Sequence, residues 1–171
     1  MSRHTWLILG LLIGGCSGPE ITHDYDPKHD FTNLKTWSFA PVPPQADGAK
    51  DPLAVSTLSL ERIQRSIDRE LRLKGFPPVD AQTADFWVQY YAIQEQRVRI
   101  DPGYDWGHDD VSTYAAGTII IDVVNPKDKR MIWRGTASDA LDPSRTPAER
   151  EEAIQEAVHE ILKDFPPKKE K

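Results

Sequence analysis

The sequence predicts one α+β domain, folded as a two-layer sandwich in which an antiparallel-dominated sheet carries two helices packed on one face. The first observation is the order of elements along the chain, which runs strands, helix, three strands, helix. The second is that each helix has one apolar stripe and so needs one covered face. The third is a polar turn between two of the strands, which is typical of antiparallel neighbours. A chain of 171 residues suffices for one such domain.

The N-terminal part of the domain is predicted to contain two short strands and a helix. The strands are expected over residues 21–25 and 35–40, and a polar, proline-rich surface loop follows over residues 41–52. Over residues 57–74, apolar side chains recur every three or four positions, which predicts an amphipathic helix with Gly75 at its C-cap. The apolar stripe consists of Leu60, Ile63, Ile67 and Leu71.

Three further strands are predicted in the middle of the chain. Residues 86–98 are rich in aromatic and β-branched side chains, and residues 101–114 are expected to form a loop. Strands are then expected over residues 117–124 and 131–140, joined by a polar turn at residues 125–129. These two strands should therefore form an antiparallel hairpin.

The strand predicted over residues 131–140 has one face of unusual shape. Trp133, Gly135 and Ala137 share that face because side chains alternate along a strand. Two of the three are small, so a helix could approach the sheet closely at this place.

The second helix is indicated by its first residues. Thr146 is a suitable N-cap, Pro147 suits the first helical position, and Glu149 stands where a capping box places a glutamate. The two prolines at 166–167 should end the segment. Its buried stripe is predicted to consist of Ile154, Ala157, Val158, Ile161, Leu162 and Phe165.

Residues 1–15 are predicted to be a signal peptide. A short positive region at Arg3 and His4 precedes an apolar stretch over residues 6–13. That stretch is too short to span a bilayer, which needs about 20 residues, but it suits the core of an export signal.

The segment Ile13-Gly14-Gly15-Cys16 resembles the lipobox of bacterial lipoproteins. Ile13, Gly14 and Gly15 would then be the residues that the signal peptidase recognises, and Cys16 would carry the lipid. An ordinary secretory signal with an incidental cysteine is the alternative. Cys16 is the only cysteine of the sequence, and lipidation would consume a thiol that is otherwise reactive in an oxidising compartment.

Lipidation at Cys16 would anchor the protein to a membrane without spanning it. Bacterial lipoproteins usually carry two or three acyl chains, which makes release slow. Residues 16–20 would form a lipidated tether, residues 21–167 the domain, and residues 168–171 a basic tail. Because Ser17 stands where an aspartate commonly retains lipoproteins at the inner membrane, we expect the periplasm-facing leaflet of the outer membrane.

Six segments of the chain together resemble the bacterial lipoproteins of domain-of-unknown-function family 4136 (DUF4136). The resemblance runs from about residue 24 to residue 167. It implies an envelope location and an α+β fold, and it supplies no catalytic residue. The segments lie at residues 24–26, 31–39, 74–76, 117–122, 133–137 and 161–166.

Charge and motifs argue against several function classes. The formal net charge of −6 repels phosphate backbones, so no nucleic-acid partner is expected. The sequence contains no phosphate-binding loop and no dinucleotide fingerprint, so no cofactor is expected either.

Two groups of residues could suggest an enzyme, and the plainer interpretation is preferred for both. His108 with Asp105, Asp109 and Asp110 contains metal-ligand types, but carboxylates in a loop are usually just solvated. A second conceivable group is the trio Ser138, Asp139 and His159, which lacks the local signature of a nucleophilic serine. We therefore expect no catalytic residue and no metal site.

Two classes of function remain open. The first is a non-catalytic envelope protein that binds a protein or glycan through a sheet edge or its aromatic loop, with Tyr104, Trp106 and Tyr114 as candidate partner contacts. The second is a hydrolase or a small-ligand carrier whose site the fold assembles. A deep apolar pocket with converging polar groups would favour the second class, and a filled core with an aromatic surface would favour the first.

Overall fold

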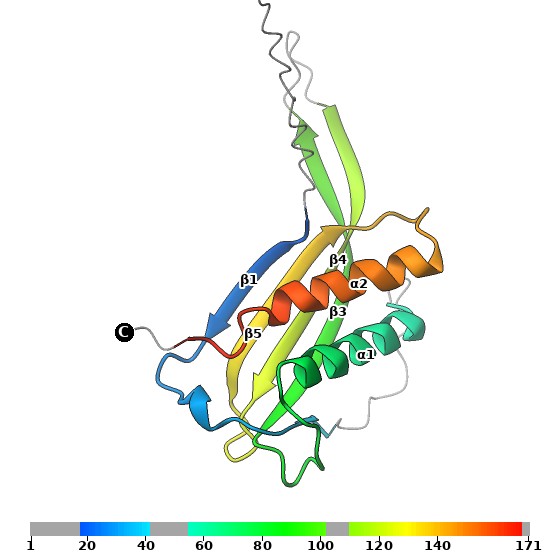
Figure 1. Ribbon diagram of the computed structural model, residues 1–171. Helices are drawn as coiled ribbons and strands as arrows, with labels where there is room; N and C mark the ends of the chain where they lie inside the picture. The colour runs from blue at the N-terminus through cyan, green and yellow to red at the C-terminus, as the bar shows by residue number, and fades with distance from the viewer. Residues whose placement is uncertain (1–17, 42–54, 102–109, 169–171) are drawn as a thin grey trace, which may run out of the picture.

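The computed structural model describes residues 18–41, 55–101 and 110–168 of the chain. They form an open five-stranded sheet in the order β1-β5-β4-β3-β2, with both helices on one face (Figure 1). The predicted α+β sandwich is confirmed. The elements are β1 (Glu20–Tyr25), a 3₁₀ turn (Phe31–Asn33), β2 (Trp37–Phe39), α1 (Thr57–Leu73), β3 (Phe86–Asp101), β4 (Asp110–Val124), β5 (Met131–Ala140) and α2 (Pro147–Leu162).

The sheet is mostly antiparallel, as predicted. β1 pairs with β5, β5 with β4, and β4 with β3 in antiparallel register. β2 pairs in parallel with β3 along only three residues, beginning with Trp37 opposite Phe86. This parallel pair makes the sheet mixed, and it closes one edge of the core.

Capping contacts define the start of α2 and the end of α1. Thr146 and Glu149 form the predicted capping box at the start of α2, with Pro147 in the first turn. At the end of α1, Gly75 has a positive φ of 87°, and the amides of Gly75 and Phe76 donate to the carbonyls of Arg72 and Leu71. These two bonds form a Schellman motif that only a left-handed residue allows. Among the described residues, no helix is long and apolar enough to cross a membrane.

The two helices lie side by side and run in the same direction (Figure 1). Contacts between them advance together along both sequences, from Arg62 with Glu151 to the Lys74 ammonium donating to the carbonyl of Lys163. Both helices therefore start at the same end of the sandwich.

The core lies between the helices and the sheet and is richest in aromatic side chains at the C-terminal ends of the helices. Phe165, just beyond α2, packs against Trp133 and Phe86 with ring centroids 5.2 and 5.5 Å apart. Trp133 and Ala137 are buried as predicted, and a Cβ on Gly135 would press on Ile161 of α2 at 2.6 Å. The small residues of β5 thus allow the close helix approach that the sequence predicted.

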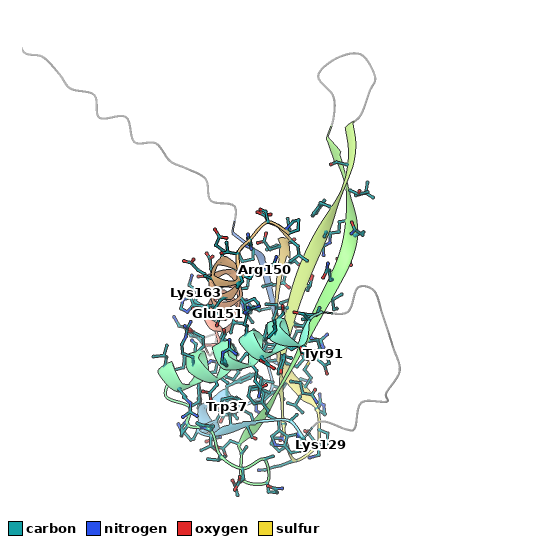
Figure 2. The ribbon with its side chains drawn as sticks, turned by 90° about the vertical axis from the view of Figure 1, so that its right-hand side faces the viewer. Trp37, Tyr91, Lys129, Arg150, Glu151 and Lys163 are labelled. Atoms are coloured by element: carbon teal, nitrogen blue, oxygen red, sulfur yellow. The ribbon has the colours of Figure 1, made fainter. Side chains whose placement is uncertain are left out.

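The expected loop over residues 101–114 is wrong in its bounds. β3 continues to Asp101 and β4 begins at Asp110, so the two strands form one long antiparallel hairpin that projects beyond the rest of the sheet (Figures 1 and 2). The reason is that Val111, Thr113 and Tyr114 are residues that favour strands, and the antiparallel register with β3 is continuous out to Asp101 opposite Asp110. Glycine and aspartate near the tip had suggested an earlier end.

Candidate functional site

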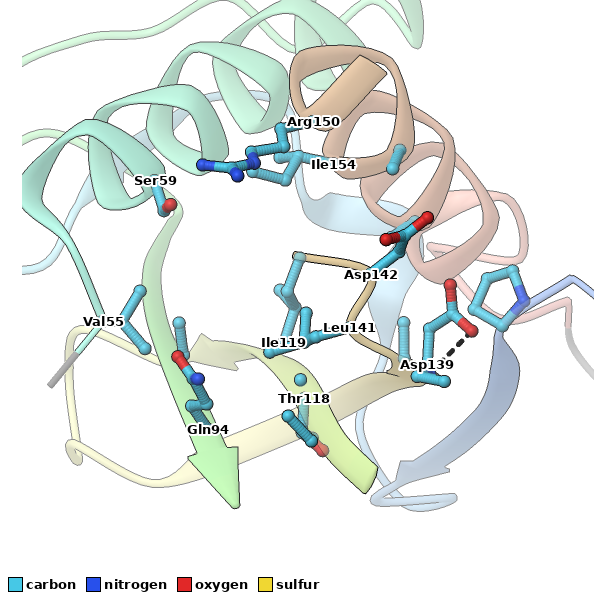
Figure 3. A pocket seen from close by; sticks show the side chains of 18 of the residues that line it. Val55, Ser59, Gln94, Thr118, Ile119, Asp139, Leu141, Asp142, Arg150 and Ile154 are labelled. Carbon is cyan, nitrogen blue, oxygen red and sulfur yellow. Dashed lines mark hydrogen bonds between the residues drawn. The ribbon is translucent and has the colours of Figure 1, made fainter. Parts of the chain in front are cut away.

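An apolar cleft opens at the end of the sandwich where both helices begin. It has a volume of about 830 Å³ and lies between the first turns of α1 and α2, strands β3, β4 and β5, and the residues that enter β1 (Figure 3). Ligand pockets in proteins commonly measure about 300–1,000 Å³. The cleft is therefore large enough for a small or elongated ligand.

The walls of the cleft are made of small and aliphatic side chains. Ala92, Ile119 and Ala137 form part of its sheet side, and Ile154 and Ala157 line it from α2. Several of these positions bear a single methyl group, so the space between helix and sheet stays open instead of being filled. Figure 3 shows Val55, Ile119, Leu141 and Ile154 around the opening.

Leu141 lines one side of the cleft. A Cβ added to Gly117 would lie 2.8 Å from its Cδ2 atom, so the two residues are in close contact. The side chain of Leu141 is nevertheless 39% exposed.

Charged side chains lie at the rim of the cleft, and four of them have partners in the loop between β5 and α2 or in the residues next to it. Arg145 lies 3.7 Å from Asp139, and the Arg150 guanidinium donates to the carbonyl of Pro143 at 2.9 Å. Asp142 accepts hydrogen bonds from the Ser144 hydroxyl and amide, which lower the pKa of that carboxyl. These groups shape the loop between β5 and α2 and do not converge on one point in the cleft.

The N-terminal entry to the domain forms part of the same cleft. Gly18 and Pro19 line it, and β1 begins at the next residue, Glu20, paired with Ser138 of β5. The ring nitrogen Nε2 of His23 donates to the carbonyl of Ile161 at 2.8 Å, since a carbonyl can only accept. The strand that brings the chain into the domain is thus fastened to the sheet and to α2.

A second cluster of charged side chains lies between the helices. Glu70 is buried, and its carboxylate accepts hydrogen bonds from Arg69 and from Nδ1 of His159 at 3.1 and 3.0 Å. Burial raises the pKa of Glu70, but the hydrogen bonds and charges of His159 and Arg69 outweigh it, so the pKa lies below its ordinary value. The cluster joins α1 to α2 and does not line the cleft.

The open face of the sheet, opposite the helices, carries a smaller apolar surface. Tyr91 and Ile93 of β3 are each 46% exposed there, and Lys129 lies 3.6 Å from the ring centroid of Trp87. Figure 2 labels Tyr91 and Lys129. Nearby, Arg134 donates two hydrogen bonds to the buried carboxylate of Asp122 at 2.6 and 2.7 Å. Aromatic, aliphatic and charged side chains thus share this face of the sheet.

Of the site residues predicted from sequence, most lie outside the described part of the chain. This holds for the lipobox residues Ile13, Gly14, Gly15 and Cys16. It also holds for the candidate contacts Tyr104 and Trp106, and for Asp105, His108 and Asp109 of the considered metal group. Within the described ranges, no group of three or more histidine, cysteine, aspartate or glutamate side chains is placed to hold a metal ion.

Tyr114 is the one candidate contact residue within the described part. It stands in β4 opposite Arg97 of β3, on the projecting part of the hairpin, and not in a loop. Hydrogen bonding to Glu95 is the main cause that raises the pKa of Arg97, and Tyr114 contributes to the same shift.

The conceivable catalytic trio is not assembled. The hydroxyl of Ser138 shares a hydrogen bond with Thr118 at 2.6 Å, and Asp139 faces Arg145. His159 instead bonds Glu70 between the helices. Each member of the trio has a structural partner of its own.

Sequence reasoning missed the cleft because its lining has no motif. The sequence did contain one signal, which is a set of small residues on strands and on a helix that elsewhere carry large apolar side chains. These small residues are Ala92, Gly117, Ala137, Ala153 and Ala157.

Comparison with known proteins shows a matching family model and solved structures with a similar fold. The family model described as "Domain of unknown function (DUF4136)" matches residues 21–167. No curated protein matches the chain in sequence.

Solved structures resemble the chain over most of its length. A DUF4136 family protein from Bacteroides thetaiotaomicron is 19% identical, with a TM-score of 0.55 over 87% of this chain and 96% of that one. A PDZ domain protein from Parabacteroides distasonis is 17% identical with a TM-score of 0.58, and the match covers 88% of this chain but only 36% of that one. A PelC dodecamer from Paraburkholderia phytofirmans is 8% identical with a TM-score of 0.52, over 84% and 95% of the two chains. At these identities the likeness concerns the fold alone.

Proposed function

The chain belongs to the DUF4136 family of domains of unknown function, and from this premise we propose that it is a lipid-anchored, periplasm-facing lipoprotein of the outer membrane that acts as a non-catalytic binding module. The lipobox at Ile13-Gly14-Gly15-Cys16 supports the anchor, and Ser17 supports the membrane. The binding surface is the apolar cleft.

The observation that carries the binding function is the composition of the cleft. Its walls are aliphatic and small, and at its rim Arg145 is paired with Asp139 while Arg150 donates to the carbonyl of Pro143. Such a surface favours an apolar, flexible ligand, because a polar ligand would lose its water without gaining hydrogen bonds.

The cleft also favours the carrier function over the hydrolase function. A hydrolase needs a nucleophile, a base and oxyanion donors within reach of one point. Among the described residues that line the cleft, the polar side chains of Thr118, Asp139 and Arg150 each have partners of their own. A small-ligand carrier is therefore the second candidate, and it shares the site with the first.

A partner that binds the projecting hairpin is a separate part of the proposal. Tyr104 and Trp106 come between β3 and β4 in the sequence, and Tyr114 lies on β4. Tyrosine and tryptophan are enriched in interface hot spots, which supports an envelope protein or glycan as the partner.

Lipidation and location are tested in cells. Cys16→Ala should abolish labelling by radioactive palmitate and leave the precursor uncleaved, and the native protein should sediment with outer-membrane markers. A labelled Cys16→Ala protein, or recovery of the native protein with inner-membrane markers, would contradict the proposal.

Binding in the cleft is tested with a dansyl-labelled fatty acid and a secreted form that starts at Ser17. That form retains every residue of the hydrophobic core, which extends from Phe31 to Phe165. Its dansyl fluorescence should rise on mixing, and Ala153→Trp should abolish the rise by filling the cleft. Glu152→Trp is the matched control, because the exposed Glu152 does not line the cleft. Equal fluorescence in all three proteins would reject the site.

A further inference from the structure

The apolar cleft lies beside the point where the membrane tether enters the domain. Gly18 and Pro19 line the cleft, and pairing of Glu20 with Ser138 fixes the chain immediately after them. Cys16 precedes Gly18 by two residues, so its Cα lies within about 7 Å of the Cα of Gly18 even when the chain is fully extended. A group attached to the thiol of Cys16 is therefore within reach of the cleft.

The walls of the cleft suit an acyl chain better than a peptide. A peptide brings backbone amides and carbonyls that need partners when buried. The cleft walls offer aliphatic contacts from Ile63, Ile119 and Ile154, and the rim groups nearest to them are already hydrogen-bonded or ion-paired. An unbranched hydrocarbon chain needs no polar partner and adapts to an irregular groove.

Resting on the lipid anchor of the proposed function, we propose that one acyl chain of the lipid on Cys16 lies in this cleft. The remaining acyl chains of the anchor stay in the membrane. A methylene group leaves water equally in a bilayer and in an apolar cleft. Moving one chain from lipid to protein therefore costs little, and it fixes the domain on the membrane with its cleft end toward the lipid.

This arrangement has a consequence for the projecting hairpin. Figures 1 and 2 show that β3 and β4 project from the same end of the sandwich at which the chain enters β1. A docked acyl chain would hold that end at the lipid surface, so the hairpin would be held in one orientation relative to the membrane. A free tether would leave the domain to rotate about its anchor.

The test uses the full-length, lipidated protein in cells that incorporate a photoactivatable fatty acid. After illumination and trypsin digestion, the lipid-bearing peptide 16–28 should be crosslinked to peptide 135–145 or to peptide 151–163. These peptides contain Ala137 with Leu141 and Ala153 with Ile154, all of which line the cleft. A crosslink within one chain identifies its own anchor as the occupant.

Each other result has a distinct meaning. A free phospholipid crosslinked to the same peptides would place a membrane lipid in the cleft and overturn the proposal while leaving the binding function intact. Labelled protein without any adduct on these peptides would also overturn it. Absence of lipid from Cys16 would overturn the anchor itself and this proposal with it.

Two variants control for the position of the crosslink. Ala153→Trp should lose the crosslink to peptide 135–145 while keeping the lipid on Cys16, and Glu152→Trp should keep both. A thermal midpoint equal to that of the native protein shows that each variant is folded. An undiminished crosslink in folded Ala153→Trp would overturn the assignment to the cleft.

Discussion

The two ends of the sandwich differ in how the space between helices and sheet is used. At the C-terminal end of α2, Phe165 has Phe31, Phe76, Phe86 and Trp133 around it, with ring centroids 5.2 to 6.4 Å away. At the N-terminal end, the corresponding space is bounded by alanine, glycine and isoleucine and is open. Both ends belong to the same layers, joined by the same two helices.

The difference shows that side-chain volume, and not the fold, decides whether this sandwich is filled. α2 is 16 residues long and so spans about 24 Å, which separates the two ends clearly. Interior space in proteins is normally filled to the density of an organic crystal. A hollow end within an otherwise filled core therefore indicates a place where something else can be bound.

The largest effect is expected at the filled end. Trp133→Ala should lower the free energy of unfolding by about 3–5 kcal/mol, because the side chain is 1% exposed and its removal leaves a cavity among rings. Ile161→Ala should cost about 2–5 kcal/mol for the same reason. Chemical denaturation measures both, and an unchanged midpoint would show that this end is not the packed core.

A smaller effect is expected where a helix rests on the sheet. Gly135→Ala should cost about 1–3 kcal/mol, since the new methyl group would press on Trp133 and Ile161. Gly117→Ala is the matched control at the hollow end, where the half-exposed Leu141 can move aside. The thermal midpoint of Gly135→Ala should lie well below that of Gly117→Ala. Equal losses of stability would contradict the difference in packing between the two ends.

The charged contact between the helices should give a pH dependence. The pKa of Glu70 is lower in the folded protein than its ordinary value of 4.5, so the unfolded chain binds more protons in the interval between the two values. The stabilisation is complete above pH 4.5 and is lost as the pH falls through the folded value. Glu70→Gln should flatten this part of the stability curve, whereas Glu61→Gln, at an exposed position of α1, should leave it unchanged.

The smallest effect is expected at the hollow end itself. Leu141→Ala should change the free energy of unfolding by about 0.5 kcal/mol or less, because the side chain is already 39% exposed and its loss creates no closed cavity. The same denaturation experiment measures it beside Trp133→Ala. A loss as large as that of Ile161→Ala would mean that the cleft is closed in solution.

Local signals predicted much of the fold. The capping box at Thr146, the left-handed Gly75 and the polar turn before Met131 each depend on neighbouring residues only, and each is confirmed. The strand predicted over residues 131–140 has those same bounds in the structure. Short-range patterns thus sufficed wherever a few adjacent residues determine the conformation.

Long-range features could not be predicted in the same way. The parallel pairing of β2 with β3 joins Trp37 to Phe86, nearly fifty positions apart, and no local pattern encodes it. The ion-paired carboxylates of Glu70 and Asp122 likewise depend on partners supplied by other elements. The cleft is a further case, because it is defined by side chains that are small rather than by groups that carry chemistry.

The attachment of β1 determines how the domain would carry a mechanical load. All six residues of β1 pair with β5, and hydrogen bonds in an antiparallel ladder lie perpendicular to the strands. A pull on the chain ahead of Glu20 along the strand axis therefore strains every bond of the ladder at once, instead of opening them one after another. The bond from His23 to the carbonyl of Ile161 resists the same displacement. A pull on the chain ahead of β1 would thus load this strand in shear, the direction in which a paired strand is hardest to extract.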